Sequence, residues 1–243
     1  MMSFDMVVEY IVSPAFFHGA LLTLLITVTA LLFGVLAGLV IALMQETRWR
    51  PLQLFTLFYV WMFRGTPVLF QIIFIYNVLP TFGIRLSAFV SAVIALALNE
   101  GAYMAEILRS GLDAVKKGQR TAGLALGLTR SQVMRWIVLP QAARIVLPPM
   151  GNQMIGMLKT SALVSVIAVE ELLLVANQAA SASFRYLEAL TAAGVYYLAL
   201  TTIFMILQAL MERNLDPKKR RRAGEKRPLL DRLLTATESA DVR

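Results

Sequence analysis

The chain has 243 residues, of which 58% are hydrophobic and 16% are charged, and its mean hydropathy is +0.68. Soluble domains carry roughly 25% charged residues, so a water-soluble globule of this size would be unable to bury so much apolar surface. Cysteine is absent and His18 is the single histidine, which excludes disulfides, thiolate zinc sites and histidine-based metal or acid–base clusters. We therefore expect a membrane protein with neither a catalytic residue nor a metal site.

Five stretches are long and apolar enough to cross a bilayer as helices, since a hydrocarbon core of about 30 Å requires roughly 20 residues. They span residues 19–44, 52–79, 89–108, 146–175 and 186–211. The second stretch contains Arg64-Gly65-Thr66-Pro67, where Pro67 removes a backbone hydrogen bond and Gly65 permits a bend. The bend is either a simple kink with Arg64 snorkelling to the interface or a gate whose two halves move.

The basic residues predict the orientation, because short cytoplasmic loops of membrane proteins are enriched in Lys and Arg. They gather after the first span, between the third and fourth spans and after the last one, as Arg48, Arg50, Arg109, Lys116, Lys117, Arg120, Arg130, Arg135, Arg144 and the run 218–222. The N-terminus is thus predicted outside and the C-terminus in the cytoplasm. Residues 1–18 form an extracytoplasmic segment, 19–212 the transmembrane domain and 213–243 a basic tail. Such a tail fixes topology or touches anionic lipid, so we expect no nucleic-acid partner.

The loop at about 110–145, between the third and fourth spans, is longer than a connection needs and is organised as helix–turn–helix. Residues 113–126 contain helix formers, and Gly127 stands where a helix favours a left-handed residue. Thr129-Arg130-Ser131-Gln132 is typical of a capping box, and Pro140 is predicted to end the second helix. The apolar stripe on this pair either packs beneath its own bundle or docks into a groove on a cytoplasmic partner.

The loop resembles the cytoplasmic signature of permease subunits of bacterial ABC importers. The resemblance lies in Gly118-Gln119, Ala122, Ala125-Leu126-Gly127 and, nine residues later, Ile137-Val138-Leu139-Pro140. Further matches point to the polar amino-acid branch, among them Phe63-Arg64-Gly65-Thr66-Pro67, Ala102-Tyr103-x-Ala105-Glu106-Ile107-x-Arg109 and Leu139-Pro140-Gln141-Ala142. The likeness covers roughly residues 19–211. It implies five transmembrane helices and an ATPase-coupling loop whose contact residues are Gly118, Gln119, Thr121, Ala122, Gly123, Gly127, Ile137, Leu139 and Pro140.

The resemblance also implies the rest of the assembly. Such permeases work with a second permease subunit, identical or homologous, with two ATP-binding subunits and with an extracytoplasmic solute-binding protein, in the bacterial cytoplasmic membrane. ATP and Mg²⁺ are expected in the partner ATPase, because this chain has no Gly-x-x-x-x-Gly-Lys-Ser/Thr loop to cradle phosphates. One departure is Thr121, which stands where the family usually has a glutamate that helps to dock the ATPase. Another is Thr160, where related permeases often have an acidic residue that suits cationic substrates.

Polar residues within the spans are candidates for the substrate pathway, because ionisable groups at bilayer depth usually face a cavity or a partner. The candidates are Arg64, Thr66, Asn99, Tyr103, Glu106, Lys159, Thr160 and Ser161. Asn99, Tyr103 and Glu106 share one helical face that could bind an ammonium or a cationic side chain.

Each of the charged candidates has an alternative interpretation. Glu106 can instead pair with Arg109, three residues on. We expect Lys159 to form an ion pair with Glu100 or Glu106, the alternative being a substrate carboxylate, and we expect Glu100 to meet a neighbouring helix.

Together these features predict the permease subunit of an ABC importer for polar amino acids or related compounds, such as basic amino acids or opines. The first alternative is an ATPase-independent secondary transporter, but such folds are commonly built from paired repeats, and none is visible here. A membrane-embedded enzyme is the second alternative, but the sequence has few candidate catalytic residues, since it has no cysteine, one histidine and no dense cluster of carboxylates. Co-purification of an ATPase would separate the three.

Overall fold

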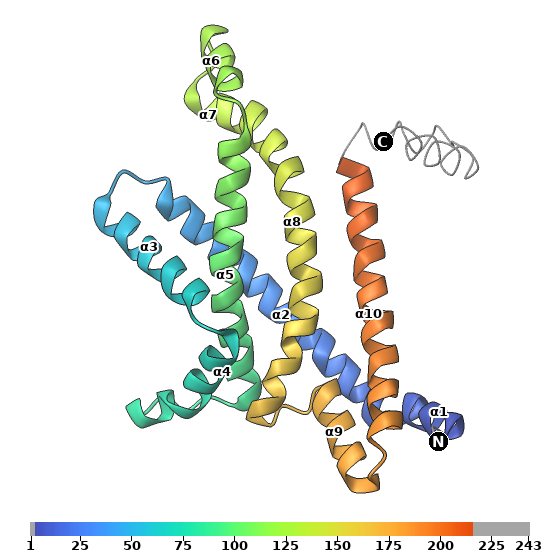
Figure 1. Cartoon of the computed structure of the whole chain (residues 1–243). Helices are drawn as coiled ribbons and strands as arrows, with labels where there is room; N and C mark the ends of the chain where they lie inside the picture. Colours follow the sequence, from blue (N-terminus) through green and yellow to red (C-terminus); the bar gives the residue numbers. More distant parts are fainter. Residues whose placement is uncertain (1–2, 216–243) are drawn as a thin grey trace, which may run out of the picture.

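The computed structural model describes residues 3–215, and within them every regular element is helical (Figure 1). The elements are α1 (Phe4–Val12), α2 (Pro14–Gln45), α3 (Arg50–Gly65), α4 (Val68–Asn77), the 3₁₀ helix η1 (Leu79–Phe82), α5 (Ala88–Ala114), α6 (Lys117–Ala125), α7 (Arg130–Gln132), the π-helix η2 (Val133–Val138), α8 (Leu139–Thr160), the 3₁₀ helix η3 (Ser161–Ile167), α9 (Leu172–Ser183) and α10 (Tyr186–Leu215). The predicted basic tail lies outside the described residues from position 216 onward.

Three described helices are long and apolar enough to span a membrane: α2, α5 and residues 186–212 of α10. A fourth span is formed if α3 and the segment 68–82 are taken together, although the chain bends by 103° between them. The fold is therefore that of an all-helical membrane protein with three or four candidate spans. The fourth predicted stretch, 146–175, corresponds mainly to α8 and η3, which carry Arg144, Lys159 and two internal prolines, Pro148 and Pro149.

The stretch 146–175 is not one helix, contrary to the sequence prediction. Helical structure ends at Ile167, Ala168 adopts a left-handed φ of 58°, and α9 begins only at Leu172. Glu171 explains the new start, since its buried carboxylate accepts hydrogen bonds from the backbone N–H groups of Leu173 (2.9 Å) and Leu174 (2.8 Å). The sequence prediction took the stretch as one mostly apolar helix and passed over the Glu170-Glu171 pair, of which Glu171 is the helix N-cap.

The helices α2 and α5 cross closely because glycines remove the side chains at their contact. A Cβ atom on Gly34 would lie 2.7 Å from the Cβ atom of Glu100, and one on Gly38 would lie 2.5 Å from that of Met104. Small residues of this kind let membrane helices approach backbone to backbone. The main core then fills the space between α2, α4, α5, α8 and η3 with fully buried side chains, including Ile26, Ile72, Leu96, Leu158 and Val164.

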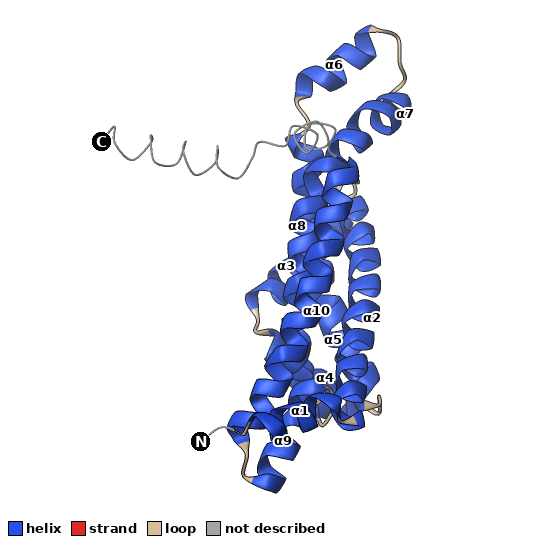
Figure 2. Ribbon diagram, turned by 90° about the vertical axis from the view of Figure 1, so that its right-hand side faces the viewer, coloured by secondary structure: helices blue, strands red, loops and turns tan. Residues whose placement is uncertain are grey.

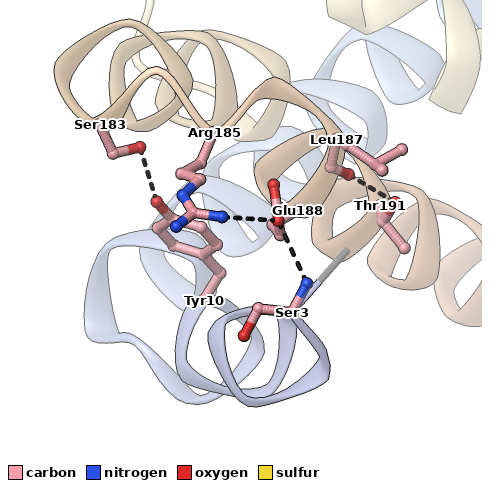
Figure 3. Close-up of polar contacts among 7 residues, drawn as sticks. All are labelled: Ser3, Tyr10, Ser183, Arg185, Leu187, Glu188 and Thr191. Atoms are coloured by element: carbon pink, nitrogen blue, oxygen red, sulfur yellow. Dashed lines mark hydrogen bonds and ion pairs between the residues drawn. The ribbon is translucent and has the colours of Figure 1, made fainter. Parts of the chain in front are cut away.

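The segment 1–18, predicted only as extracytoplasmic, contains the helix α1, which packs against α10. The backbone N–H of Ser3 donates to Glu188 Oε1 (3.2 Å), and the hydroxyls of Tyr10 and Ser183 lie 2.9 Å apart (Figure 3). Arg185 adds an ion pair of 3.3 Å to the same Glu188 carboxylate. These contacts gather α1, α9 and the start of α10 at one end of the molecule, as Figure 2 shows.

The loop helices α6 and α7 lie at the opposite end from α1 and α9 (Figures 1 and 2). Two predicted details are confirmed: Gly127 has a φ of 81°, and Thr129 and Gln132 form a complete capping box. The predicted helix over 113–126 is wrong, because the chain turns at Val115 and Lys116 between α5 and α6.

Pro140 does not end the second loop helix, contrary to the sequence prediction. The wider π turns of η2 pass directly into α8, and Pro140 occupies the first turn of that helix, where a missing N–H is tolerated.

Candidate functional site

A polar cavity of about 530 Å³ opens where the α3–α4 break faces α5 and α8. Its lining is Arg64, Gly65, Thr66, Pro67, Val68, Asn99, Glu100, Tyr103, Gln153, Gly156, Met157 and Thr160. Five of the eight predicted substrate-pathway residues line it, namely Arg64, Thr66, Asn99, Tyr103 and Thr160. Polar side chains therefore converge on one cavity within an otherwise apolar bundle.

The alternative interpretation of Glu106, an ion pair with Arg109, is wrong. Glu106 forms an ion pair with Arg64 on α3, whose guanidinium also lies over the ring of Tyr103, 5.2 Å from its centroid. Arg109 lies instead beside Asp113, with 3.8 Å between Nε and Oδ2. The Arg64–Glu106 pair links α3 to α5 at the edge of the cavity, and both side chains are about 40% exposed, so water screens their attraction.

Glu100 was expected to meet a neighbouring helix, and this is confirmed by its contact with Gln153 on α8. Gln153 Nε2 donates to Glu100 Oε2 over 3.3 Å. The residue is 3% exposed, and its second oxygen, Oε1, is buried without a hydrogen-bond partner among residues 3–215. Buried carboxylate oxygens are normally paired, and Glu100 is also one of the residues that line the cavity.

Asn99 lies beside the helix break and is joined there by Gln71, a residue that the sequence reasoning missed. Asn99 Nδ2 donates to the Phe63 carbonyl (2.9 Å) and to Gln71 Oε1 (3.1 Å). Gln71 Nε2 contacts the same Phe63 carbonyl (2.9 Å) and both the carbonyl and the hydroxyl of Thr66, at 3.1 and 2.9 Å. The sequence did contain one sign that Gln71 has a polar partner, because it is the one glutamine in the apolar run of α4, four residues after Pro67.

The expected ion pair of Lys159 with a glutamate of α5 is wrong. Glu106 is held by Arg64 and Glu100 by Gln153, while Lys159 is exposed and has no ion pair or hydrogen bond within the described part of the chain. The reason is the position of Lys159 around the helix axis. Residues 153, 156, 157 and 160 of α8 face the cavity, and Lys159 points about 100° away from Thr160 around that axis.

Ser161 also lies off the cavity. It is buried, and its hydroxyl donates to the Leu158 carbonyl over 2.8 Å, with the hydroxyl of Thr27 3.4 Å away. Its contacts are therefore those of a core residue.

In the loop, the apolar residues divide into a buried set and an exposed set. Val115, Val133, Val138 and Ala142 form a small core of their own. Gly123 is buried against it, since a Cβ atom there would lie 2.7 Å from Ile137 Cδ1. Leu126 is 82% exposed, and Leu124, Trp136 and Leu139 are exposed as well. The other predicted coupling residues that are exposed are Gly118, Gln119, Thr121, Ala122, Gly127 and Pro140.

Residues 30–217 match the family model described as binding-protein-dependent transport system inner membrane component. The chain is 37% identical over 203 residues to the arginine transport system permease protein ArtQ of Bacillus subtilis (strain 168), covering 83% of this chain and 93% of that protein. It is 36% identical over 216 residues to the glutamine transport system permease protein GlnP of Escherichia coli (strain K12), covering 88% and 99%. It also resembles the solved structure described as an amino acid ABC transporter with histidines, with 41% identity, a TM-score of 0.83, and 88% and 99% coverage.

Proposed function

We propose, from the chain's membership of the binding-protein-dependent transport family of inner membrane components, that it carries polar amino acids through the cavity described above. The chain is an inner-membrane permease subunit of an ABC importer, and ATP hydrolysis belongs to a separate chain. The observation that carries the proposal is the polar cavity of about 530 Å³, which Glu100 and five of the predicted pathway residues line. Ligand pockets for small molecules span about 300–1,000 Å³.

The cavity has the groups that an amino-acid zwitterion needs. Glu100 accepts an ammonium or, in a basic amino acid, a guanidinium group, while Thr66, Thr160 and Gln153 offer neutral hydrogen-bond partners. Because the relatives named for arginine and for glutamine are about equally similar to this chain, the substrate class includes both cationic and neutral polar amino acids. Opines, which combine an amino acid with a second acid, belong to the same chemical class.

The test is uptake of labelled L-arginine, L-glutamine and L-leucine by the complete complex in proteoliposomes loaded with Mg-ATP. We expect uptake of the two polar amino acids and little of leucine. Glu100→Gln should lower arginine uptake at least tenfold and glutamine uptake less, because arginine brings two cationic groups to the cavity and glutamine brings only its ammonium group. Glu170→Gln, an exposed glutamate outside the cavity, is the matched control.

Uptake driven by an ion gradient without ATP would contradict the importer assignment and favour a secondary transporter. Equal transport of leucine, or a Glu100→Gln variant with unchanged arginine uptake, would contradict the proposed role of the cavity. The first outcome tests whether the protein is an ATP-driven importer, and the other two test whether the cavity is the substrate site.

The assembly that we propose contains two permease subunits, two ATP-binding subunits with ATP and Mg²⁺, and an extracytoplasmic solute-binding protein. The loop from α6 to η2 docks on the ATP-binding subunit, which the exposure of Leu126 and Trp136 supports. Thr121 is exposed on α6 and brings no charge, so this docking rests on apolar contact rather than on an acid. The solute-binding protein meets the opposite end, where α1 and α9 lie.

We propose five membrane crossings. In chain order they are α2, α3 with α4, α5, α8 with η3, and α10. An odd number of crossings puts the two termini on opposite sides, and the basic residues place the loop helices and the C-terminus in the cytoplasm. Pro148, Pro149 and Arg144 lower the apolarity of α8, and packing of this helix against α5 and α10 compensates by shielding it from lipid.

A further inference from the structure

The carbonyl of Phe63 is one of the backbone groups that lose their helical partner at the break between α3 and α4. In a continuous α-helix the carbonyl of residue 63 accepts a hydrogen bond from the N–H of residue 67. Residue 67 is a proline, which has no N–H, and the helix stops at Gly65 and restarts at Val68 after a bend of 103°. A carbonyl left unpaired inside a membrane is strongly unfavourable, so the Phe63 oxygen requires donors from elsewhere.

Two side-chain amides supply those donors. Asn99 Nδ2 from α5 and Gln71 Nε2 from α4 each lie 2.9 Å from the Phe63 oxygen. The two amides are also bonded to each other, and Gln71 contacts both oxygens of Thr66. The network therefore ties together the end of α3, the start of α4 and the middle of α5.

We propose that Asn99 and Gln71 are positioning residues that hold the α3–α4 bend and thereby set the wall of the transport cavity. Residues 64–68 line that cavity, so the bend determines where its wall stands. Direct substrate contact does not account for Gln71, which is 5% exposed and does not line the cavity. The inference rests on the proposed function only in taking the cavity as the transport path, since the bend itself can be measured without substrate.

The bend can be measured with spin labels, because the chain contains no cysteine that would have to be removed. Labels at Leu54 and Phe82, which are 66% and 74% exposed, report the distance across the break. A straight helix would separate these positions by about 42 Å, and the bend shortens this by roughly 40%. In the assembled complex we expect Asn99→Leu and Gln71→Leu to lengthen and broaden the distance distribution.

The matched control is Gln208→Leu. Gln208 is a half-buried amide that, like Gln71, donates to a backbone carbonyl, that of Pro148 (3.4 Å), but this carbonyl lies within a continuous helix. The control should leave the distance unchanged. An unchanged distribution in Gln71→Leu would overturn the proposal. Should Gln71→Leu fail to assemble, Gln71→Glu keeps the length of the side chain, lacks the NH₂ donor and is expected to give the same shift.

A rescue experiment separates positioning from mere stability. Pro67→Ala returns an N–H that can bond the Phe63 carbonyl, so the double variant Gln71→Leu with Pro67→Ala should recover the melting temperature lost in Gln71→Leu. Uptake of labelled arginine should nevertheless stay at least tenfold below wild type, because the bend is no longer held. Recovery of both properties, or of neither, would overturn the proposal. A wild-type complex that takes up no amino acid would contradict the proposed function and leave the distance measurement standing.

Discussion

At the scale of single residues, a few buried polar atoms decide how the helices meet. Glu171 is the clearest case, because its carboxylate is fully buried and joins three helices. It caps α9, accepts a hydrogen bond from the Tyr197 hydroxyl on α10 (2.9 Å) and lies 3.5 Å from the Thr23 hydroxyl on α2. Such a cap satisfies the free N–H groups of the first helical turn, which otherwise have no partner in the bilayer.

Glu171→Ala should therefore destabilise the complex by about 2–3 kcal/mol, because several hydrogen bonds to a buried carboxyl group and the helix cap are lost together. Tyr197→Phe removes one of those hydrogen bonds and should cost about 1–2 kcal/mol. The neighbouring Glu170→Ala is the control, since Glu170 is exposed. Melting temperatures of the purified complex measure the effect, and equal values for Glu170→Ala and Glu171→Ala would contradict the capping role.

The residue scale also shows where sequence reasoning stops. The shared face of Asn99 and Tyr103 was predictable from helical spacing, and both line the cavity. The partners of charged residues were not predictable, because they depend on how each helix is rotated against its neighbours. Lys159 and Thr160 are adjacent in sequence, yet only Thr160 reaches the cavity.

Lys159→Met should consequently leave the melting temperature of the complex within about a degree of wild type, because the exposed lysine has no ion pair in residues 3–215. A buried pair broken on one side would instead cost about 3–5 kcal/mol. The measurement is thermal unfolding in detergent alongside uptake. A drop of several degrees, restored by Glu100→Gln or Glu106→Gln, would re-establish the ion pair that the sequence suggested.

At the scale of elements, motifs with a specific backbone requirement predicted local structure correctly, whereas apolar composition alone misplaced helix boundaries. The Gly65–Pro67 interruption, the left-handed Gly127 and the Thr129 capping box all follow from backbone chemistry. The start of α9 was missed because the stretch was judged by its mostly apolar composition, and the Glu170-Glu171 pair within it was not considered as a helix boundary. The π-helix at η2 was missed because periodicity assumes α-helical turns, and a proline in the following turn was taken as a stop.

Gly127 provides a test at this scale. Its φ of 81° is unfavourable for a β-branched residue by roughly 1–2 kcal/mol, while no atom lies close enough to obstruct a side chain. Gly127→Val should therefore misorient α6 against η2 and abolish substrate-stimulated ATP hydrolysis in the assembled complex. Gly127→Asn is the matched control, because asparagine tolerates this conformation, and it should keep most of the stimulation. Normal stimulation in the valine variant would remove the loop from the coupling mechanism.

At the scale of the whole molecule, the hydrophobic map predicted the membrane class and the approximate positions of α2, α5 and α10, because long apolar helices have few alternatives to the bilayer. The number of spans was harder to predict, because α3 and α4 are separated by a break and α8, although continuous, contains prolines and charged residues. The two ends of the molecule are built differently. Basic loop helices lie at one end, and the contacts of α1, α9 and α10 lie at the other.

These two ends should face opposite sides of the membrane, and single cysteines can test this in a chain that has none of its own. Ser183 ends α9, Ser131 lies in α7, and both are exposed. A cysteine at position 183 should react in intact cells with an impermeant maleimide, because the positive-inside rule keeps the basic loop in the cytoplasm. A cysteine at position 131 should react only after the membrane is opened. Labelling both positions in opened membranes controls for accessibility, and the reverse pattern in intact cells would invert the orientation and, with it, the side on which the ATPase docks.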